Sequence, residues 1–170
     1  MKRKSVSRSA SPVLSAALIA GTIWSGPVAR AAEAEYVSLG DSFASVGSYW
    51  TTSLNSDCAQ ATDDVGHLVA ARMPGVRLTD LACGGTSTDL VEKGSTALSP
   101  ETKFVSISTG GNNEDFYMGM LQNCFIAGAL CTPEVRSEAH AKLDRLGEQL
   151  DEAYGAVRAE APNAHVVVIG

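Results

Sequence analysis

Short apolar runs alternate with amphipathic stretches along most of the chain. Four runs have the length and composition of β-strands, and each ends in small or polar residues. They cover residues 36–39, 76–81, 104–108 and 166–169. Apolar residues at helical spacing separate the runs, most clearly over residues 132–160. This alternation predicts an α/β fold, with a parallel sheet that carries helices on both faces.

The longest predicted helix has clear boundaries. Thr132 is typical of an N-cap, and Pro133 of the first helical position. An apolar stripe runs along it, formed by Leu143, Leu146, Leu150, Tyr154 and Val157. We expect this stripe to face the core, and a partner interface is the alternative. The last run, residues 166–169, is continuously apolar, so we expect that strand to be buried on both faces.

The first 31 residues have the layout of a secretory signal peptide. A basic start precedes an apolar run from Val13 to Trp24, and Ala29-Arg30-Ala31 forms a small-residue exit. Gly21 and Pro27 interrupt the apolar region, which argues against the alternative of a membrane anchor. We therefore divide the chain into a signal peptide, residues 1–31, and one domain, residues 32–170. The prediction is a secreted protein without a stable membrane anchor.

The charge of the chain limits its partners. The net charge is −6, and removal of residues 1–31 takes away five basic residues and no acidic ones, which leaves −11. No basic face is present outside that leader, so we expect no nucleic-acid partner. The length suits a single hydrophobic core, and we expect a monomer.

The four cysteines fit an exported protein with two disulfides. They are Cys58, Cys83, Cys124 and Cys131. No Cys-x-x-Cys spacing occurs, so we expect no metal site and no other cofactor. Three pairings are possible. We favour Cys124–Cys131, which closes a short loop, together with Cys58–Cys83.

Three predicted strands run into glycine-rich turns, and these turns carry the candidate chemistry. The turns are Gly40-Asp41-Ser42, Gly84-Gly85-Thr86 and Gly110-Gly111-Asn112-Asn113. In a parallel sheet all three lie at the carboxyl edge, where ligands bind. A serine hydroxyl, backbone N–H groups and amide side chains would meet there, as the stabilisation of a tetrahedral oxyanion requires. Each turn also has a purely structural alternative: helix caps, or glycines that adopt positive φ.

These blocks resemble the SGNH hydrolases of the GDSL esterase/lipase family, especially the secreted, disulfide-containing members of actinobacteria. The matching blocks are Gly40-Asp41-Ser42-Phe43, Ala82-Cys83-Gly84-Gly85 and Thr109-Gly110-Gly111-Asn112-Asn113, within a resemblance that spans residues 35–170. It implies a flavodoxin-like three-layer αβα fold and hydrolysis of small-molecule or lipid carboxylic esters through an acyl-enzyme. It also implies that Ser42 is the nucleophile. The implied oxyanion hole consists of the N–H groups of Ser42 and Gly85 and the side chain of Asn112. The family has the same disulfide pairing.

Two departures from the family pattern affect the expected activity. Asn113 stands where the family usually has Asp, and the closing Asp-x-x-His block is absent. His67 and His140 fall within helical patterns, where we expect them to face solvent, and His165 precedes a strand at the opposite sheet edge. Asp41 adjoins the nucleophile but is a weak base for a serine.

We therefore expect a carboxylic ester hydrolase that lacks its last strand and catalytic histidine, truncated at the carboxyl terminus and impaired in activity. The alternative is a non-catalytic acyl- or glycan-binding remnant of the same fold. A phosphate-binding module is disfavoured, because no P-loop and no Gly-x-Gly-x-x-Gly pattern is present.

Overall fold

The computed structural model describes residues 34–48, 53–55, 57–126 and 131–170. The chain divides into two units, residues 1–30 and residues 31–170, and every described residue belongs to the second unit. The expected signal peptide therefore lies outside the described residues and stays a prediction. Within the described ranges, no helix is both long enough and apolar enough to cross a membrane.

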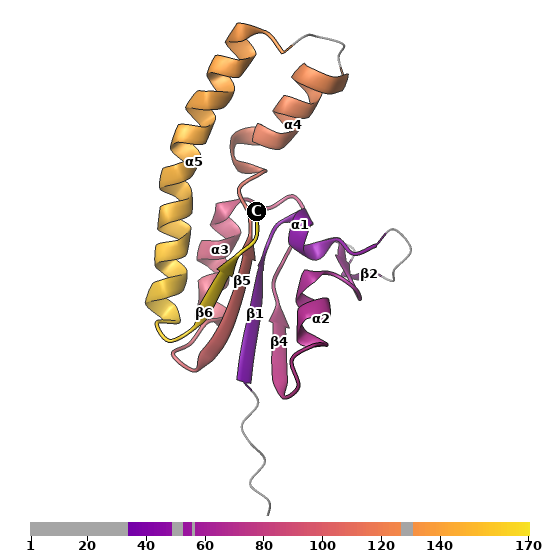
Figure 1. Ribbon diagram of the computed structural model, residues 1–170, viewed down its shortest axis with the longest axis vertical. Coiled ribbons are helices and arrows are strands. Elements are labelled where there is room, and N and C mark those ends of the chain that lie inside the picture. Colours follow the sequence, from indigo (N-terminus) through magenta and orange to yellow (C-terminus); the bar gives the residue numbers. More distant parts are fainter. Residues whose placement is uncertain (1–33, 49–52, 56, 127–130) are drawn as a thin grey trace, which may run out of the picture. The chain divides into compact units, whose positions relative to one another are not determined.

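Four parallel strands form the central sheet, in the order β4-β1-β5-β6 (Figure 1). They are β1 (Ala34–Gly40), β4 (Val76–Asp80), β5 (Thr102–Ser108) and β6 (His165–Val168). β1 pairs with β4 on one side and with β5 on the other, where Leu39 lies opposite Ile107. β6 pairs with β5 and forms one edge of the sheet. All four predicted strands are present, and the predicted parallel sheet is confirmed.

The helices are interspersed among these strands. They are α1 (Ser42–Ser45), α2 (Val65–Ala70), α3 (Thr88–Gly94), α4 (Phe116–Met120) and α5 (Pro133–Glu160). Short 3-10 turns occupy Ser95–Ala97 and Asn113–Asp115, and a π-helical turn, Leu121–Ile126, continues α4. Two short antiparallel strands, β2 (Ser53–Asn55) and β3 (Gln60–Ala61), lie apart from the main sheet.

Helices cover both faces of the main sheet. Successive residues of β1 point to opposite faces, and two glycines show which helix each face meets. A Cβ added to Gly66 of α2 would lie 2.9 Å from the Ser38 side chain. A Cβ added to Gly94, at the end of α3, would lie 2.7 Å from the Leu39 side chain. Because Ser38 and Leu39 are neighbours in β1, α2 and α3 pack on opposite faces, and the three-layer αβα arrangement is confirmed (Figure 1).

The face toward α3 and α5 carries the hydrophobic core. Val37 and Leu39 of β1 and Val105 and Ile107 of β5 alternate onto this face. The core cluster is completed by Val91, Leu98, Ala153, Val157, Ala161 and Ala164. Full burial of a side chain such as valine or leucine contributes about 1.5–3 kcal/mol. This layer therefore holds the central strands, and the turns that follow them, in place.

The face toward α2 is more polar. The Tyr36 hydroxyl and the Ser106 hydroxyl share a hydrogen bond of 2.8 Å between β1 and β5. Burial raises the pKa of Tyr36. The pKa of Asp80 is raised to about 6, mainly by burial and in addition by the adjoining Asp64 carboxyl. Polar side chains thus occupy the space between α2 and the sheet.

α5 begins where the sequence predicts. The Thr132 side chain accepts a hydrogen bond from the N–H of Val135 at 3.3 Å, and Pro133 is the first helical residue. The predicted apolar stripe is confirmed only in the second half of the helix, where Val157 is buried, whereas Leu143 is exposed. The first half lies beside α4, so its apolar residues do not reach the sheet.

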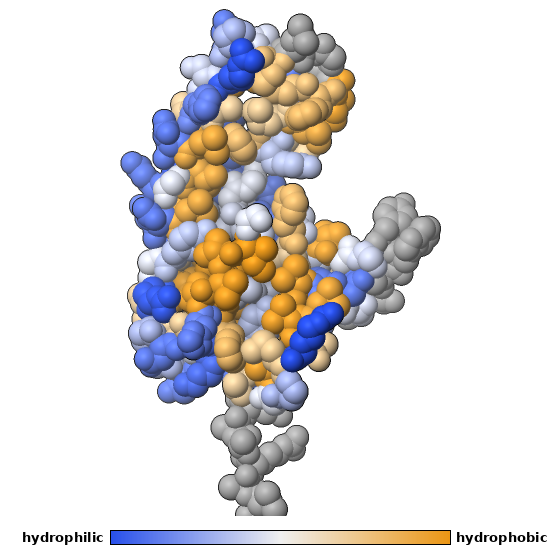
Figure 2. Space-filling view, viewed as in Figure 1, coloured by the Kyte–Doolittle hydropathy of each residue, from blue (hydrophilic) through white to orange (hydrophobic). Residues whose placement is uncertain are grey.

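The prediction that the last strand is buried on both faces is wrong. Val167 and Val168 are 57% and 52% exposed. β6 lies at the edge of the sheet, and α2 packs mainly on β1 and β4. Apolar residues are therefore visible in the middle of this face (Figure 2). They surround a hollow of about 190 Å³ lined by Phe104, Val167 and Ile169 among others.

Candidate active site

The turn after β1 places Ser42 at the start of a helix. Gly40 has a φ of +151°, and a Cβ there would overlap the Ser108 carbonyl oxygen, so only glycine fits. The N–H of Asp41 donates to that same carbonyl oxygen at 2.8 Å. The Asp41 side chain accepts from the N–H of Phe43 at 2.9 Å and is the N-cap of α1. The capping alternative is therefore correct for Asp41, and it leaves Ser42 without a capping role.

The turn after β4 is tied to the first turn and to a disulfide. The N–H of Cys83 donates to the Gly40 carbonyl oxygen at 2.9 Å. The N–H of Gly84 donates to the Cys58 carbonyl oxygen at 2.7 Å, beside the Cys58–Cys83 disulfide. Gly85 follows with a φ of +80°. The second disulfide joins Cys124 to Cys131, so both bonds agree with the expected pairing.

The turn after β5 contacts the turn after β4 through Asn112. The side-chain amide of Asn112 donates to the Thr86 carbonyl oxygen at 2.8 Å. Thr86 in turn donates through its hydroxyl to the Cys83 carbonyl oxygen at 2.6 Å. The structure therefore brings all three turns together at the carboxyl edge of β1, β4 and β5.

Three hydrogen-bond donors at this edge are available to a ligand. Among the described residues, neither the N–H of Ser42 nor the N–H of Gly85 donates a backbone hydrogen bond. The Asn112 amide carries two hydrogens, and Thr86 accepts one of them. These three donors come from the groups that the resemblance assigns to an oxyanion hole. Their roles in catalysis remain predictions.

Asn113 has a structural role that the sequence did not reveal. Its side chain accepts from the N–H of Thr88 at 3.2 Å and donates to the Thr88 hydroxyl at 2.8 Å. It also donates to the Gln149 side chain of α5 at 2.7 Å. Asn113 thus links the third turn to the start of α3 and to α5. Gln149 lies 36 residues away, and no local pattern marks this contact.

The three histidines of the chain lie in other surroundings. His140 is exposed on α5, and His165 stacks on Phe104 with ring centroids 6.0 Å apart. His165 is the first residue of β6, at the opposite sheet edge, as predicted. His67 was expected to face solvent, which is wrong in part: its ring turns inward and lies 2.7 Å from a buried Asp64 oxygen. The partner of His67 sits three residues earlier in the chain, as the cap of α2.

A hollow of about 270 Å³ opens between the ends of β1, β5 and β6. Its wall includes Asp41, Phe43, Ser108, Thr109, Gly111, Ile169 and Gly170. Phe43 is exposed and meets Tyr117 edge-on, with ring centroids 6.2 Å apart. An apolar group attached to a polar centre could occupy this hollow. Ser42 does not line the hollow itself but lies between its residues Asp41 and Phe43.

Asp41 is almost fully buried beneath this hollow. Burial raises the pKa of its carboxyl, and hydrogen bonds from the backbone of Phe43, Asp41 and Gly111 partly oppose that shift. The carboxylate therefore helps to hold two of the turns in position. Asp41 is adjacent to Ser42 in the chain, and its side-chain oxygen is directed toward the N–H of Phe43, which it caps.

Known proteins are similar to this chain in sequence and in fold. Residues 38–170 match the GDSL-like Lipase/Acylhydrolase family. The chain is 36% identical over 140 residues to a lipase of Streptomyces rimosus, an alignment that covers 80% of this chain and 52% of that lipase. It is 39% identical over 140 residues to Lipase 1 of Streptomyces coelicolor (strain ATCC BAA-471 / A3(2) / M145), covering 79% and 51%.

The fold resembles a solved structure as well. The crystal structure of an extracellular lipase from Streptomyces rimosus superposes with a TM-score of 0.72 and 35% sequence identity. The match covers 81% of this chain and 59% of that one. The chain spans about half the length of the two lipases to which its sequence was aligned.

Proposed function

The chain belongs to the GDSL-like lipase/acylhydrolase family, and from this premise we propose that it is a carboxylic ester hydrolase that forms an acyl-enzyme on Ser42. One observation carries the proposal. The three turns meet at one sheet edge, where Ser42 stands at the start of α1. The N–H groups of Ser42 and Gly85 and the second hydrogen of the Asn112 amide have no described backbone acceptor there. A serine with such donors suits acyl transfer.

The proposed reaction has two steps. The Ser42 oxygen attacks the ester carbonyl carbon, and the carbonyl oxygen takes up negative charge. The N–H groups of Ser42 and Gly85 and the free amide hydrogen of Asn112 stabilise that charge. The alcohol leaves with a proton, and water then attacks the acyl-enzyme to release the carboxylic acid and restore the Ser42 hydroxyl.

We assign the role of general base to none of the three histidines. His67 contacts Asp64, and His140 lies on the exposed side of α5. His165 stacks on Phe104 at the amino end of β6, whereas Ser42 follows the carboxyl end of β1. A serine without a base reacts slowly, because its hydroxyl must lose the proton by another route. We therefore propose impaired turnover for these 170 residues.

The hollow beside Ser42 is the proposed site for the acyl part of the substrate. Phe43 and Ile169 supply apolar surface to this hollow. The two aligned proteins are lipases, which supports a lipid or small ester as the substrate class. We further propose that the protein is secreted after cleavage of residues 1–31. The two disulfides support this, as does the similarity to an extracellular lipase.

Hydrolysis of p-nitrophenyl esters of increasing acyl length tests the function. In the wild type we expect a slow burst that releases up to one p-nitrophenol per chain, followed by a still slower turnover, because water must attack the acyl-enzyme without a base as well. Ser42→Ala should abolish the burst, and Ser137→Ala, at an exposed serine of α5, should leave it unchanged. A burst of equal size in Ser42→Ala would contradict the proposal.

The alternative function is non-catalytic binding of an acyl group. It is favoured only because none of the three described histidines is placed as a base for Ser42. It predicts saturable binding of a fatty acid without any acylation of Ser42. A covalent Ser42 intermediate detected by mass spectrometry excludes this alternative, whereas saturable binding with no intermediate supports it.

A further inference from the structure

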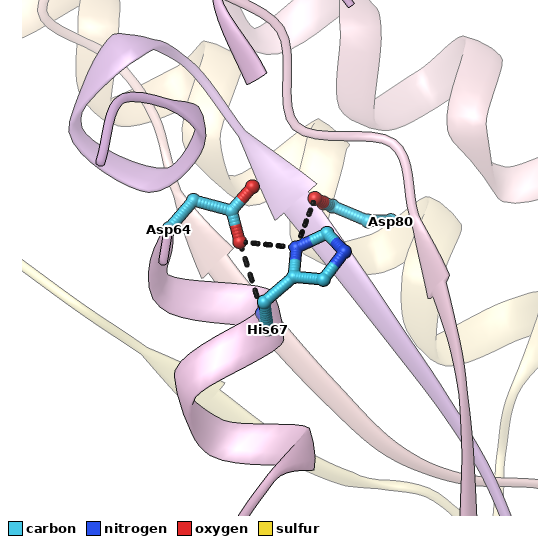
Figure 3. Close-up of side chains that lie close together, drawn as sticks. All are labelled: Asp64, His67 and Asp80. Atoms are coloured by element: carbon cyan, nitrogen blue, oxygen red, sulfur yellow. Dashed lines mark hydrogen bonds and ion pairs between the residues drawn. The ribbon is translucent and has the colours of Figure 1, made fainter. Parts of the chain in front are cut away.

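Two aspartates and a histidine gather between α2 and the end of β4 (Figure 3). Asp64 is the N-cap of α2, His67 lies one turn later, and Asp80 is the last residue of β4. One ligand-type atom from each side chain lies within 4.8 Å of the others. This cluster contains none of the residues proposed for ester hydrolysis.

Each carboxylate in the cluster has one oxygen in use and one unpaired. Oδ1 of Asp64 accepts from the backbone N–H of His67 at 2.9 Å and lies 2.7 Å from the ring Nδ1. Oδ1 of Asp80 accepts from the N–H of Ala82 at 3.1 Å. Oδ2 of Asp64 and Oδ2 of Asp80 have no donor partner of standard hydrogen-bond geometry within the described ranges. The carboxyl of Asp80 also interacts with the Asp64 carboxyl and with the Ser38 hydroxyl, which likewise lacks such a partner.

Burial makes these unpaired oxygens costly. The Asp64 side chain is fully buried, and that of Asp80 is 8% exposed. No lysine or arginine of the described part of the chain forms an ion pair with either residue. Buried carboxylates are normally paired with a cation or bound to a metal. The imidazole of His67 faces both, at 2.7 Å from Asp64 and 3.6 Å from the unpaired Asp80 oxygen.

We propose that Asp64, His67 and Asp80 bind one divalent transition-metal ion, with zinc as the best fit. Zinc accepts imidazole nitrogen and carboxylate oxygen together, usually in a tetrahedral set of four ligands. Three protein ligands leave one position for water. Calcium and magnesium prefer sets made of oxygen alone, so the ring nitrogen of His67 disfavours them.

The distances suit such an ion after a small adjustment. Two ligands at about 2.0–2.1 Å from zinc lie about 3.3 Å apart in a tetrahedral arrangement. The separation of 3.6 Å between His67 Nδ1 and Asp80 Oδ2 is close to this value. The distance of 2.7 Å between His67 Nδ1 and Asp64 Oδ1 must lengthen by less than an ångström if that oxygen is to bind the same ion. The one-third exposed His67 side chain provides a path of entry.

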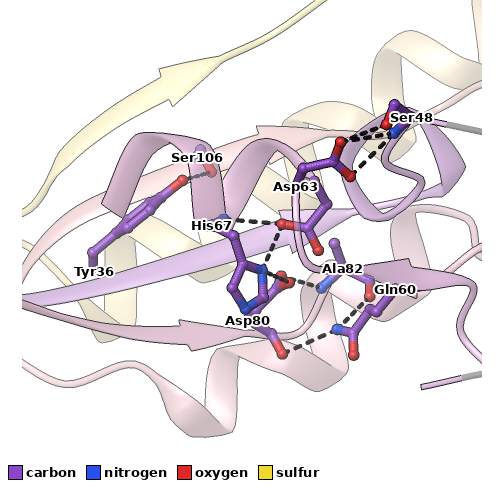
Figure 4. Close-up of polar contacts among 9 residues, drawn as sticks. Tyr36, Ser48, Gln60, Asp63, His67, Asp80, Ala82 and Ser106 are labelled. Atoms are coloured by element: carbon purple, nitrogen blue, oxygen red, sulfur yellow. Dashed lines mark hydrogen bonds and ion pairs between the residues drawn. The ribbon is translucent and has the colours of Figure 1, made fainter. Parts of the chain in front are cut away.

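Outer hydrogen bonds already orient the ligands (Figure 4). The Gln60 side chain donates to the backbone carbonyl oxygens of Asp80 and Ala82, at 3.2 and 2.8 Å. The Ala82 N–H holds Asp80 Oδ1, which turns Oδ2 toward His67. In metal sites, hydrogen bonds from outer residues hold the metal-binding residues in the required orientation. The bound ion would cross-link α2 to β4, so the role that we infer is structural.

Zinc titration of the chelator-treated full chain tests the site. We expect one zinc ion per chain and an increase in the melting temperature on binding. His67→Gln and Asp80→Asn should weaken the affinity at least tenfold, because each removes a ligand. The matched control His140→Gln, at an exposed histidine of α5, should bind as the wild type does. Equal affinity in all four proteins would overturn the proposal.

A measurement on the wild type alone covers the case in which a variant fails to fold. In histidine-selective NMR spectra, zinc should shift the ring signals of His67 and leave those of His140 and His165 in place. Cobalt substituted for zinc should give the visible absorption of a tetrahedral site. No shift at His67, or a shift at another histidine alone, would overturn the proposal. Esterase activity decides neither result, so the site and the proposed function can fail separately.

Discussion

The side-chain amide of Asn112 donates a hydrogen bond to the backbone carbonyl oxygen of Thr86 at 2.8 Å. This contact joins the turn after β5 to the turn after β4 and fixes the direction of the amide. The second hydrogen of the same amide remains available to a ligand. The direction of the Asn112 amide is therefore fixed without a ligand, and in the proposed reaction a donor held in this way would stabilise developing charge effectively.

Removal of this amide should slow the acylation of Ser42. For Asn112→Ala we expect a decrease of about a hundredfold or more in the acylation rate, because one oxyanion donor is lost. Stopped-flow measurement of p-nitrophenol release gives the rate. The control Asn163→Ala removes an exposed amide that binds the Pro100 carbonyl oxygen, and its rate should stay unchanged. Acylation of Asn112→Ala at the wild-type rate would remove Asn112 from the site.

Gly40 should tolerate no side chain. The Gly40→Ala variant introduces a Cβ that overlaps the Ser108 carbonyl oxygen at a φ of +151°. We expect the free energy of unfolding to fall by roughly 2–4 kcal/mol, from overpacking and backbone strain together. Urea unfolding measures it. Gly155→Ala is the control: Gly155 lies in α5 with open space around it, so alanine should stabilise the protein by about 0.5–1 kcal/mol. Similar losses in both variants would contradict this account.

Asn113 should contribute to stability through its three hydrogen bonds. Asn113→Ala leaves the Thr88 N–H and the Gln149 side chain without this partner. We expect a loss of about 2–3 kcal/mol in the free energy of unfolding. Asn113→Asp restores the residue usual in the family and should cost much less, because Thr88 can donate its hydroxyl and Gln149 can rotate its amide. An aspartate variant less stable than the alanine variant would contradict this role of Asn113.

The buried Asp41 carboxyl should make stability depend on pH. Burial raises its folded-state pKa above the ordinary value of 3.8. A group with a raised folded-state pKa stabilises the fold below its unfolded-state pKa, and that contribution is lost as the pH rises through the folded-state value. Relative to Asp41→Asn, which cannot ionise and can still cap α1, the wild type should lose stability as the pH rises from about 3.8. Urea unfolding of both proteins between pH 3 and pH 7 provides the comparison. A stability difference that does not change with pH would contradict the prediction.

The strands and their turns could be predicted because both depend on local pattern. An apolar run that ends in glycine and polar residues marks the end of a strand, and parallel pairing then brings such ends together. Ser42, Gly85 and Asn112 come from three separate turns, and the meeting of these turns followed from this rule. Burial of the last strand could not be predicted in this way. Exposure of Val167 depends on what packs over an edge strand.

Contacts between distant segments explain the remaining differences. The ring of His67 contacts Asp64 of its own helix cap, but its approach to Asp80 at 3.6 Å occurs only because β4 pairs beside β1. The link from Asn113 to Gln149 needs α5 to pack against the third turn. The exposure of Leu143 follows from a helix whose first half lies beside α4. None of these relationships has a signal in the local sequence, because each requires the tertiary arrangement of other elements.

Reaction of the chain with a fluorophosphonate probe, followed by peptide mass spectrometry, tests directly whether Ser42 is a nucleophile. We expect a single adduct on Ser42 that forms slowly, since none of the three described histidines is placed to take the proton of that hydroxyl. Asn112→Ala should slow its formation further, and Ser42→Ala should prevent it. No adduct on Ser42, or preferential labelling of another serine, would contradict the proposal that Ser42 is the nucleophile of an ester hydrolase.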